Sequence, residues 1–331
     1  MWSTKTLQPK AGIYAERVAD IVDVAARLIR RDGRFALVTS LSIEGGAARE
    51  VGSLAIVEPD GTMTGYLSNG CIDRDIQQRA LMAFQANRKE VVRYGEGSRF
   101  LDLKLPCGGA LELLIDPAPD SDQLLKAKQD FDARGQATLH FSDGGADQKN
   151  YSFTYEPRVR LCLAGRGAIF RSMAYLGHAT GYEVTLISPD TEDLAATQHL
   201  STQAPIHLTS FNQALDLSGL DERSAFLTLF HDHDWEPHLL LKALETSAGF
   251  IGSLGSRRTH AMRCETLIGL GAAETDISRL RGPIGLVGSL RDASLIAVSA
   301  LAEIVSTFPS QLAAVQTASL GGSDERLAQT V

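Results

Sequence analysis

The sequence predicts an α/β protein of two domains, a sheet-rich α+β domain followed by a doubly wound parallel sheet. The chain has 331 residues, the length of about two average domains. Of these, 44% are apolar, which is enough for two hydrophobic cores. Hairpin signals dominate the first third of the sequence, whereas strands and helices alternate after residue 158.

The N-terminal α+β domain is predicted to span residues 1–119. Apolar residues at helical spacing predict a first helix that ends near Arg31. A turn at Asp60-Gly61 between two short apolar runs predicts a hairpin. A second helix is predicted to follow Cys71. The strands of this domain are expected at residues 35–41, 53–59, 62–67, 89–95 and 110–116.

The rest of the chain is predicted to contain a connector, the second domain and a tail. Residues 120–157 indicate one helix and one hairpin, packed on one of the domains. Residues 158–310 alternate strands and helices, as in a parallel sheet covered on both faces. Residues 311–331 are polar and rich in small residues, so we expect a flexible tail. The strands of the second domain are expected at residues 159–165, 182–188, 204–208, 224–230 and 248–255.

Composition and charge narrow the classes of function. The formal net charge is -8 and the pI is about 5.5, which disfavours nucleic acid or an anionic membrane as a partner. The N-terminus has no apolar core of the signal-peptide type, and the longest apolar runs are too short to span a bilayer, so we expect a cytoplasmic protein. The four cysteines form no CxxC pair, which disfavours a zinc ribbon or a disulfide scaffold. Cys162 and Cys264 are expected to be small buried residues.

The first strand–helix turn of the second domain resembles the start of a dinucleotide-binding fingerprint. Gly165 would form the tight turn, and Gly167, after Arg166, would let a pyrophosphate approach the backbone. Phe170 replaces the third small residue of that pattern, and Ser188 stands where an acid normally binds a ribose 2′-hydroxyl. The turn therefore predicts a Rossmann-like topology and only weakly indicates NAD binding, and a Rossmann-like domain with no nucleotide is the alternative.

A second loop with the character of an anion site follows the last predicted strand. It reads Gly255-Ser256-Arg257-Arg258 and opens a helix. Free backbone N–H groups, the helix dipole and guanidinium donors all favour an anion such as phosphate there. In the alternative interpretation, Ser256 only caps the helix and the two arginines are solvated.

A polar segment that contains His231 and Asp232 follows the fourth predicted strand. The carboxyl ends of parallel strands line one crevice, so both residues are expected to face the same crevice as the two glycine loops. Adjacent His and Asp residues in one loop cannot all converge on one ion. We therefore favour a contact with a polar ligand, or a hydrogen bond that stabilises the loop, over a metal site.

Six segments in order resemble the XdhC/CoxI family of molybdenum-enzyme maturation factors, over roughly residues 35–310. Two departures from the family pattern stand out. Asn69 precedes Gly70 where the family usually has two glycines before its cysteine, and Ile169 and Phe170 stand where a histidine often occurs. The segments are 52–71, 107–109 with the strand that follows, 164–170, His231-Asp232, 250–258, and 283–286 with the helix at 295–305.

The resemblance implies a chaperone and not an enzyme, with no catalytic residue. It implies that the molybdenum cofactor, as molybdopterin or its cytosine dinucleotide, is a transient cargo that the protein helps to sulfurate. It further implies insertion of this cargo into a xanthine dehydrogenase- or aldehyde oxidoreductase-type apoenzyme. Implied partners are the large subunit of that molybdenum hydroxylase, a cysteine desulfurase, a cofactor-modifying nucleotidyltransferase and a second copy of the chain.

Two other classes of function remain open. An NAD(P)-dependent oxidoreductase would use the Rossmann-like domain, with His231 as an acid or base near the nicotinamide. A pure interaction scaffold would carry vestigial loops, so that only surface residues would matter. Reduction of NAD with a substrate would favour the oxidoreductase, and insensitivity to changes at Cys71 or Arg257 would favour the scaffold.

Two glycine–cysteine turns are the cofactor-binding candidates in the first domain. They are Asn69-Gly70-Cys71 and Cys107-Gly108-Gly109. Thiolates suit soft metals, so Cys71 is the candidate molybdenum ligand and a candidate thiolate or persulfide group. A small buried residue that lets the turn pack fits Cys71 equally well. For Cys107 we favour a structural role, with the two following glycines allowing close backbone approach.

Overall fold

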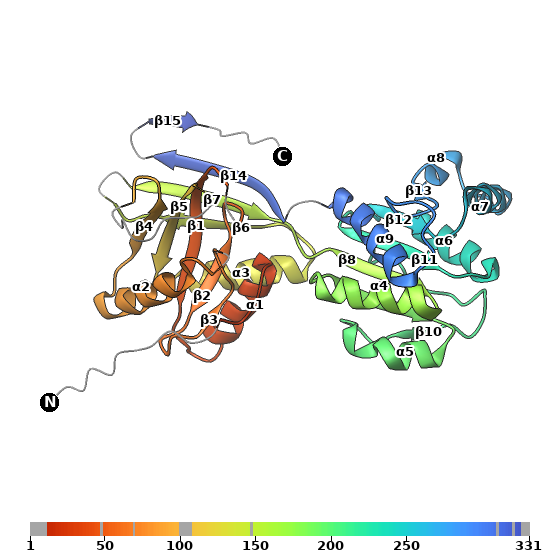
Figure 1. Cartoon of the computed structure of the whole chain (residues 1–331), viewed down its shortest axis with the longest axis horizontal. Coiled ribbons are helices and arrows are strands. Elements are labelled where there is room, and N and C mark those ends of the chain that lie inside the picture. Colours follow the sequence, from red (N-terminus) through yellow and green to blue (C-terminus); the bar gives the residue numbers. More distant parts are fainter. Residues whose placement is uncertain are drawn as a thin grey trace. The chain divides into compact units, whose positions relative to one another are not determined.

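The computed structural model describes residues 12–46, 49–68, 70–98, 108–145, 148–308, 311–319 and 322–325. The chain divides into two compact units, drawn in Figure 1. Unit 1 contains residues 1–157 and 310–331, and unit 2 contains residues 158–309. Unit 2 therefore begins where the sequence changes to regular alternation of strands and helices.

The first sheet of unit 1 is antiparallel, with strand order β3-β2-β1-β5-β4. Its strand residues alternate between two cores. Leu37 and Ile56 pack in one core with helix α1, and Val38 and Val57 pack in the other with helix α2. The elements are α1 (Val18–Ile29), β1 (Ala36–Glu44), β2 (Leu54–Val57), β3 (Met63–Thr64), α2 (Asp73–Ala86), β4 (Glu90–Gly95) and β5 (Ala110–Asp116).

The second sheet of unit 1 has the strand order β15-β14-β7-β6. The predicted helix and hairpin of the connector are present, and Phe131 and Phe153 share the core that contains Leu37. The connector thus belongs to unit 1. The elements are α3 (Ser121–Asp132), β6 (Ala137–Ser142), β7 (Lys149–Tyr155), β14 (Leu312–Ser319) and β15 (Gly322–Glu325).

The prediction of a flexible tail is wrong for residues 312–319. They form β14, which pairs with β7 from Leu312 opposite Tyr155 to Ser319 opposite Lys149. An unpaired strand edge presents a row of N–H and C=O groups, and β14 satisfies those of β7. Leu312 and Val315 also pack against the core of unit 1.

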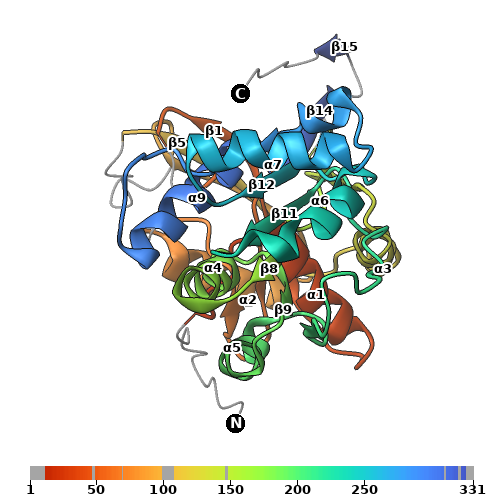
Figure 2. The same ribbon diagram turned by 90° about the vertical axis from the view of Figure 1, so that its right-hand side faces the viewer.

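Unit 2 confirms the predicted doubly wound parallel sheet, with strand order β10-β9-β8-β11-β12-β13. Helices α4 and α9 pack on one face and α6 and α7 on the other, and Figure 2 shows α9 and α6 on opposite sides of β11. The strands are β8 (Arg160–Gly165), β9 (Glu183–Ser188), β10 (Ile206–His207), β11 (Ser224–Leu229), β12 (Phe250–Ser253) and β13 (Leu280–Arg281). The α-helices are α4 (Gly167–Ala179), α5 (Thr191–Thr197), α6 (Glu236–Leu244), α7 (Arg257–Gly269), α8 (Glu274–Ile277) and α9 (Ala293–Thr307), with 3-10 turns at Gln198–Leu200 and His233–Trp235.

The chain order reverses between β8 and β11. Successive strands are added on one side of β8 as far as β10 and on the other side of β11 as far as β13. Ligands of open α/β sheets bind outside the carboxyl ends of the strands near such a reversal. The topology therefore places the loops after β8, β11 and β12 in the position of a binding site. Within the described parts of the chain, no helix is both long and apolar enough to cross a membrane.

Candidate functional site

A pocket of about 930 Å³ lies at the carboxyl ends of β11 and β12 in unit 2. Binding sites for small molecules usually have volumes of about 300–1,000 Å³, so this pocket has the size of a ligand site. Its walls come from three loops and from the beginnings of α4, α7 and α9. They include His231 after β11, Leu254–Arg257 after β12, Pro283–Leu290, and Ile296 and Ser299 on α9.

The loop after β12 forms the polar side of this pocket. Gly255, Ser256 and Arg257 line it, whereas Arg258 does not. Ser256 is the N-cap of α7, and its hydroxyl accepts a hydrogen bond from the Thr259 N–H at 3.1 Å. The capping interpretation is thus correct for Ser256, but the cap also places the positive end of the helix and the Arg257 side chain at the pocket, where both favour an anion.

A buried network of hydrogen bonds fixes the position of the loop after β12. The Arg263 guanidinium donates to both oxygens of Glu236, at 2.9 and 3.2 Å, and to the Leu254 carbonyl at 2.7 Å. The Thr228 hydroxyl donates to Glu236 at 3.1 Å and lies 2.6 Å from the Ser253 hydroxyl. The network ties α6 and α7 to the ends of β11 and β12. It was not predicted from the sequence, although two hydroxyl residues in otherwise apolar strands were a signal.

Helix α9 holds the opposite wall of the pocket, the loop Pro283–Leu290. The Gly285 N–H donates to the Glu303 carboxylate at 2.6 Å, and the Val287 N–H donates to the Ser299 hydroxyl at 2.7 Å. Leu286 and Val287 line the pocket and are 62% and 59% exposed, so their side chains give this wall an apolar surface. A pocket with one cationic side and one apolar wall suits a ligand that has an anionic group and an apolar or flat body.

The first glycine turn of unit 2 lies next to this pocket but is itself internally paired. Arg166 forms an ion pair with Asp232 at 3.0 Å, and the Gly167 N–H donates to the Asp193 carboxylate at 2.5 Å. A Cβ on Gly165 would lie 2.6 Å from that of Leu229, so this glycine allows close packing between strand ends. Of the candidates from the sequence, His231 therefore lies with Gly255–Arg257 on the pocket wall, whereas Asp232 turns to Arg166.

In unit 1, the turn before α2 exposes Cys71. The carboxylate of Asp73 accepts hydrogen bonds from the backbone N–H groups of Leu67, Ser68 and Gly70, each at 3.1 Å. Asp73 therefore organises the cysteine turn, a role that was not predicted for it from the sequence. Since the Cys71 residue is exposed, the alternative of a small buried residue does not describe it.

The other glycine–cysteine turn is described only in part. Asn69 and Cys107 lie outside the described residues. Gly108 has a positive φ of 69°, and Gly109 lies against residues 44–46, where a Cβ would be 2.5 Å from the Glu44 carbonyl oxygen. Gly109 thus shows the close backbone approach that was expected of this turn. The described residues contain no group of three or more His, Cys, Asp or Glu side chains that could hold a metal ion.

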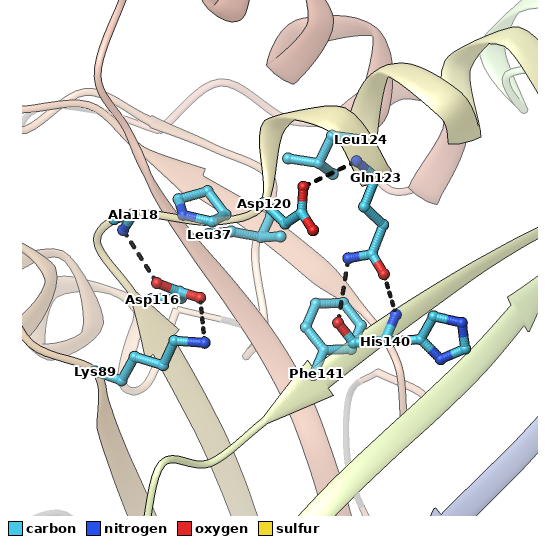
Figure 3. Close-up of a pocket in the computed structure, with 10 residues that line it drawn as sticks. Leu37, Lys89, Asp116, Ala118, Asp120, Gln123, Leu124, His140 and Phe141 are labelled. Atoms are coloured by element: carbon cyan, nitrogen blue, oxygen red, sulfur yellow. Dashed lines mark hydrogen bonds and ion pairs between the residues drawn. The ribbon is translucent and has the colours of Figure 1, made fainter.

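A smaller pocket of about 180 Å³ lies in unit 1 between the first sheet, α3 and β6. Figure 3 shows that the side chains of Lys89, Asp116, Asp120 and Gln123 are paired with one another or with the backbone. Lys89 forms an ion pair with Asp116 at 2.9 Å, and Gln123 exchanges hydrogen bonds of 2.7 and 3.2 Å with the His140 backbone. This pocket is a small gap between packed elements whose polar groups already have partners. The pocket of unit 2 is therefore the candidate site.

Comparisons with known proteins agree over both units. A model of the XdhC Rossmann domain matches residues 161–304, and a model of the XdhC and CoxI family matches residues 28–95. The molybdenum cofactor insertion chaperone PaoD of Escherichia coli strain K12 is 30% identical over 312 residues, which cover 90% of this chain and 91% of PaoD. A protein of Bacillus subtilis strain 168, named as a probable subunit of xanthine dehydrogenase, is 24% identical over 313 residues, covering 82% of this chain and 92% of that protein.

One solved structure extends this agreement to three dimensions. A crystal structure described as a xanthine dehydrogenase from Bacillus halodurans matches with a TM-score of 0.70 and 19% identity. The match covers 88% of this chain and 96% of that one. At this identity the likeness shows a shared fold, which includes both units of the chain.

Proposed function

Because this chain belongs to the XdhC and CoxI family, we propose that it is a chaperone that binds the molybdenum cofactor and inserts it into a molybdenum hydroxylase. This chain is 30% identical to the molybdenum cofactor insertion chaperone PaoD over 90% of its length, which supports this cargo. The recipient would be an apoenzyme of the xanthine dehydrogenase or aldehyde oxidoreductase type. No turnover of a small substrate is expected.

The observation that carries the proposal is the pocket of unit 2, with its Arg257 loop on one side and its apolar loop on the other. The cofactor has a phosphate group, a fused heterocycle and a metal–sulfur head. The phosphate suits the N-terminus of α7 and the Arg257 guanidinium. The heterocycle suits the wall formed by Leu286 and Val287. His231, which lines the same pocket, would form a hydrogen bond with the polar edge of the heterocycle.

In unit 1, the exposed Cys71 is the candidate residue for the chemistry of the metal–sulfur head, because thiolates bind soft centres. We propose that Gly70 and the second turn, Cys107-Gly108-Gly109, assist it together with Asn69. In the same proposal, Cys71 takes part in adding the terminal sulfido ligand, for which a cysteine desulfurase would supply sulfur. A homodimer, a nucleotidyltransferase partner, the cytosine dinucleotide form of the cargo and a cytoplasmic location are further parts of the proposal.

Retention of cofactor by wild type and variants tests this proposal. Wild type, Cys71→Ala, Arg257→Ala and Arg258→Ala are each incubated with molybdenum cofactor and desalted, and bound molybdenum, pterin and cytidine nucleotide are measured. We expect wild type to retain pterin and molybdenum together, and Arg257→Ala to lose both. Arg258→Ala is the matched control, because Arg258 does not line the pocket, and it should behave as wild type.

The pattern of loss separates the two parts of the proposal. Cys71→Ala should retain pterin but hold molybdenum or its sulfido ligand less well. Cytidine nucleotide in the retained fraction would identify the dinucleotide form. If folded wild type retained no cofactor but bound NAD(P) tightly, the chaperone function would be wrong and the oxidoreductase would be favoured.

A further inference from the structure

The first glycine turn of unit 2 already holds an anion, the side chain of Asp193. In dinucleotide-binding folds, the pyrophosphate binds the backbone N–H groups at the N-terminus of the helix that follows the first strand. The corresponding helix here is α4, which begins at Gly167. One carboxylate oxygen of Asp193 accepts the hydrogen bond from the Gly167 N–H, and the other accepts one from Arg171.

This carboxylate is fixed in place by its own helix, α5. Asp193 is only 2% exposed, and its backbone N–H donates to the Asp190 side chain at 3.0 Å. The Thr197 hydroxyl donates to the Asp193 carbonyl at 2.7 Å. The side chain therefore has little freedom to leave the turn, and it meets both the positive end of α4 and a guanidinium there.

We propose that Asp193 occupies the phosphate position of this turn and so excludes nucleotide pyrophosphates from it. A phosphate at the Gly167 N–H would have to displace a buried carboxylate or lie against it as a like charge, and both are unfavourable. Arg166, the cation at the start of the turn, is already paired with Asp232 at 3.0 Å. Ser188 is fully buried, so it cannot replace the missing acid that reads a ribose.

The consequence is a division of roles between the two glycine loops of unit 2. The turn after β8 keeps the Rossmann backbone but carries its own anion, whereas the loop after β12 presents Arg257 to the pocket. Ordinary dinucleotides are thereby kept out of a domain whose fold would otherwise accept them. This inference is independent of the identity of the cargo, because it concerns a different turn and different ligands.

Opening the turn by mutation tests the inference. ADP and NADH are the probes, with binding measured by calorimetry for ADP and by fluorescence for NADH. Asp193→Ser removes the carboxylate and frees the Gly167 N–H and Arg171, so affinity for both probes should rise by about two- to thirtyfold, the range expected for an anion at a helix N-terminus. Asp122→Ser, at an exposed site of unit 1, makes the same change in net charge and should give no gain.

A second, more conservative variant keeps the inference testable if Asp193→Ser does not fold. Asp193→Asn keeps an oxygen that can accept from Gly167 but lacks the charge, and it should show a smaller gain than Asp193→Ser. Circular dichroism establishes that each variant is folded. The inference is wrong if wild type binds ADP and NADH as tightly as the variants, or if folded Asp193→Ser and Asp193→Asn show no gain over Asp122→Ser.

Discussion

Arg263 and Glu236 form a buried ion pair that fixes the position of the loop after β12, which contains Arg257. Two nitrogens of the guanidinium lie 2.9 and 3.2 Å from the two carboxylate oxygens, and the side chains are 5% and 1% exposed. Arg263 also donates to the Leu254 carbonyl, next to Gly255. The anion loop therefore depends on a charge pair that is out of contact with solvent.

Removal of one partner of this pair should destabilise unit 2 strongly. Arg263→Met leaves the Glu236 carboxylate buried without its cation, which should lower the free energy of unfolding by about 3–5 kcal/mol. Urea unfolding followed by the fluorescence of Trp235, in a Trp2→Phe background, would report on unit 2. Lys242→Ala breaks an exposed pair with Glu245 and should cost less than about 1 kcal/mol. Equal effects of the two substitutions would contradict the prediction.

Glu303 should control cofactor affinity without touching the cofactor. Its carboxylate accepts from the Gly285 N–H at 2.6 Å and pairs with Arg281 at 3.6 Å, and it thereby holds the apolar wall of the pocket. A hydrogen bond to a charged group stabilises the fold by about 1.5–3 kcal/mol, which is the upper limit of its effect on binding, so Glu303→Ala should lower affinity for the cofactor by up to roughly tenfold to a hundredfold. Glu274→Ala, at an exposed site on α8, is the control. Unchanged affinity in folded Glu303→Ala would show that α9 does not position this wall.

The main elements of both units could be predicted because their signals are local. The strand at 110–116 was predicted with the bounds that β5 has, and the turn at Asp60-Gly61 does join the antiparallel strands β2 and β3. Strand β14 was missed because its stability comes from pairing with β7, more than 150 residues earlier in the chain. Its residues are also mostly small, which by itself is typical of a tail as well as of a strand.

In the candidate site, too, residues with a local sequence signal were predicted, whereas contacts between distant residues were not. Gly255, Ser256 and Arg257 were identified because a glycine, a cap and a cation adjoin one another in the sequence. The partners that hold the site were not, since the bond from Gly167 to Asp193 spans 26 residues and that from Arg263 to Glu236 spans 27. No local pattern indicates which acid will meet which donor until the sheet and its helices are assembled.

The exposed thiol of Cys71 and the buried thiol of Cys162 should differ sharply in reactivity. Burial raises the pKa of the Cys162 thiol to about 12, so it remains un-ionised and inaccessible at pH 8. Cys71 is exposed, and iodoacetamide should therefore modify it faster than Cys162 in the native protein. Peptide mass spectrometry would measure both, with modification in denaturant as the reference. Native modification of Cys162 as fast as that of Cys71 would contradict its burial.

His260 should make unit 2 less stable at mildly acidic pH. It lies on α7 one turn after Ser256, and a Cβ on Gly282 would lie 2.3 Å from its Nδ1. Burial, followed by the positive charge of Arg263, lowers the pKa of His260 below the ordinary value of 6.5. The unfolded chain therefore binds a proton at a higher pH than the folded chain does. The free energy of unfolding should fall as the pH drops below about 6.5, and His260 should have no effect above it.

His260→Gln would separate this effect from the titration of carboxylates, because the other acids are unchanged in the variant. Urea unfolding of wild type and variant at pH 7.5, 6.5, 6.0 and 5.5 would measure the difference in slope (these values bracket the ordinary pKa of about 6.5). The variant should lose less stability than wild type over the acidic part of this range. Met262→Gln, which introduces the same side chain at an exposed site of α7 without removing an imidazole, should retain the slope of wild type. Parallel curves for wild type and His260→Gln would mean that this imidazole takes up its proton equally well in the folded and the unfolded chain.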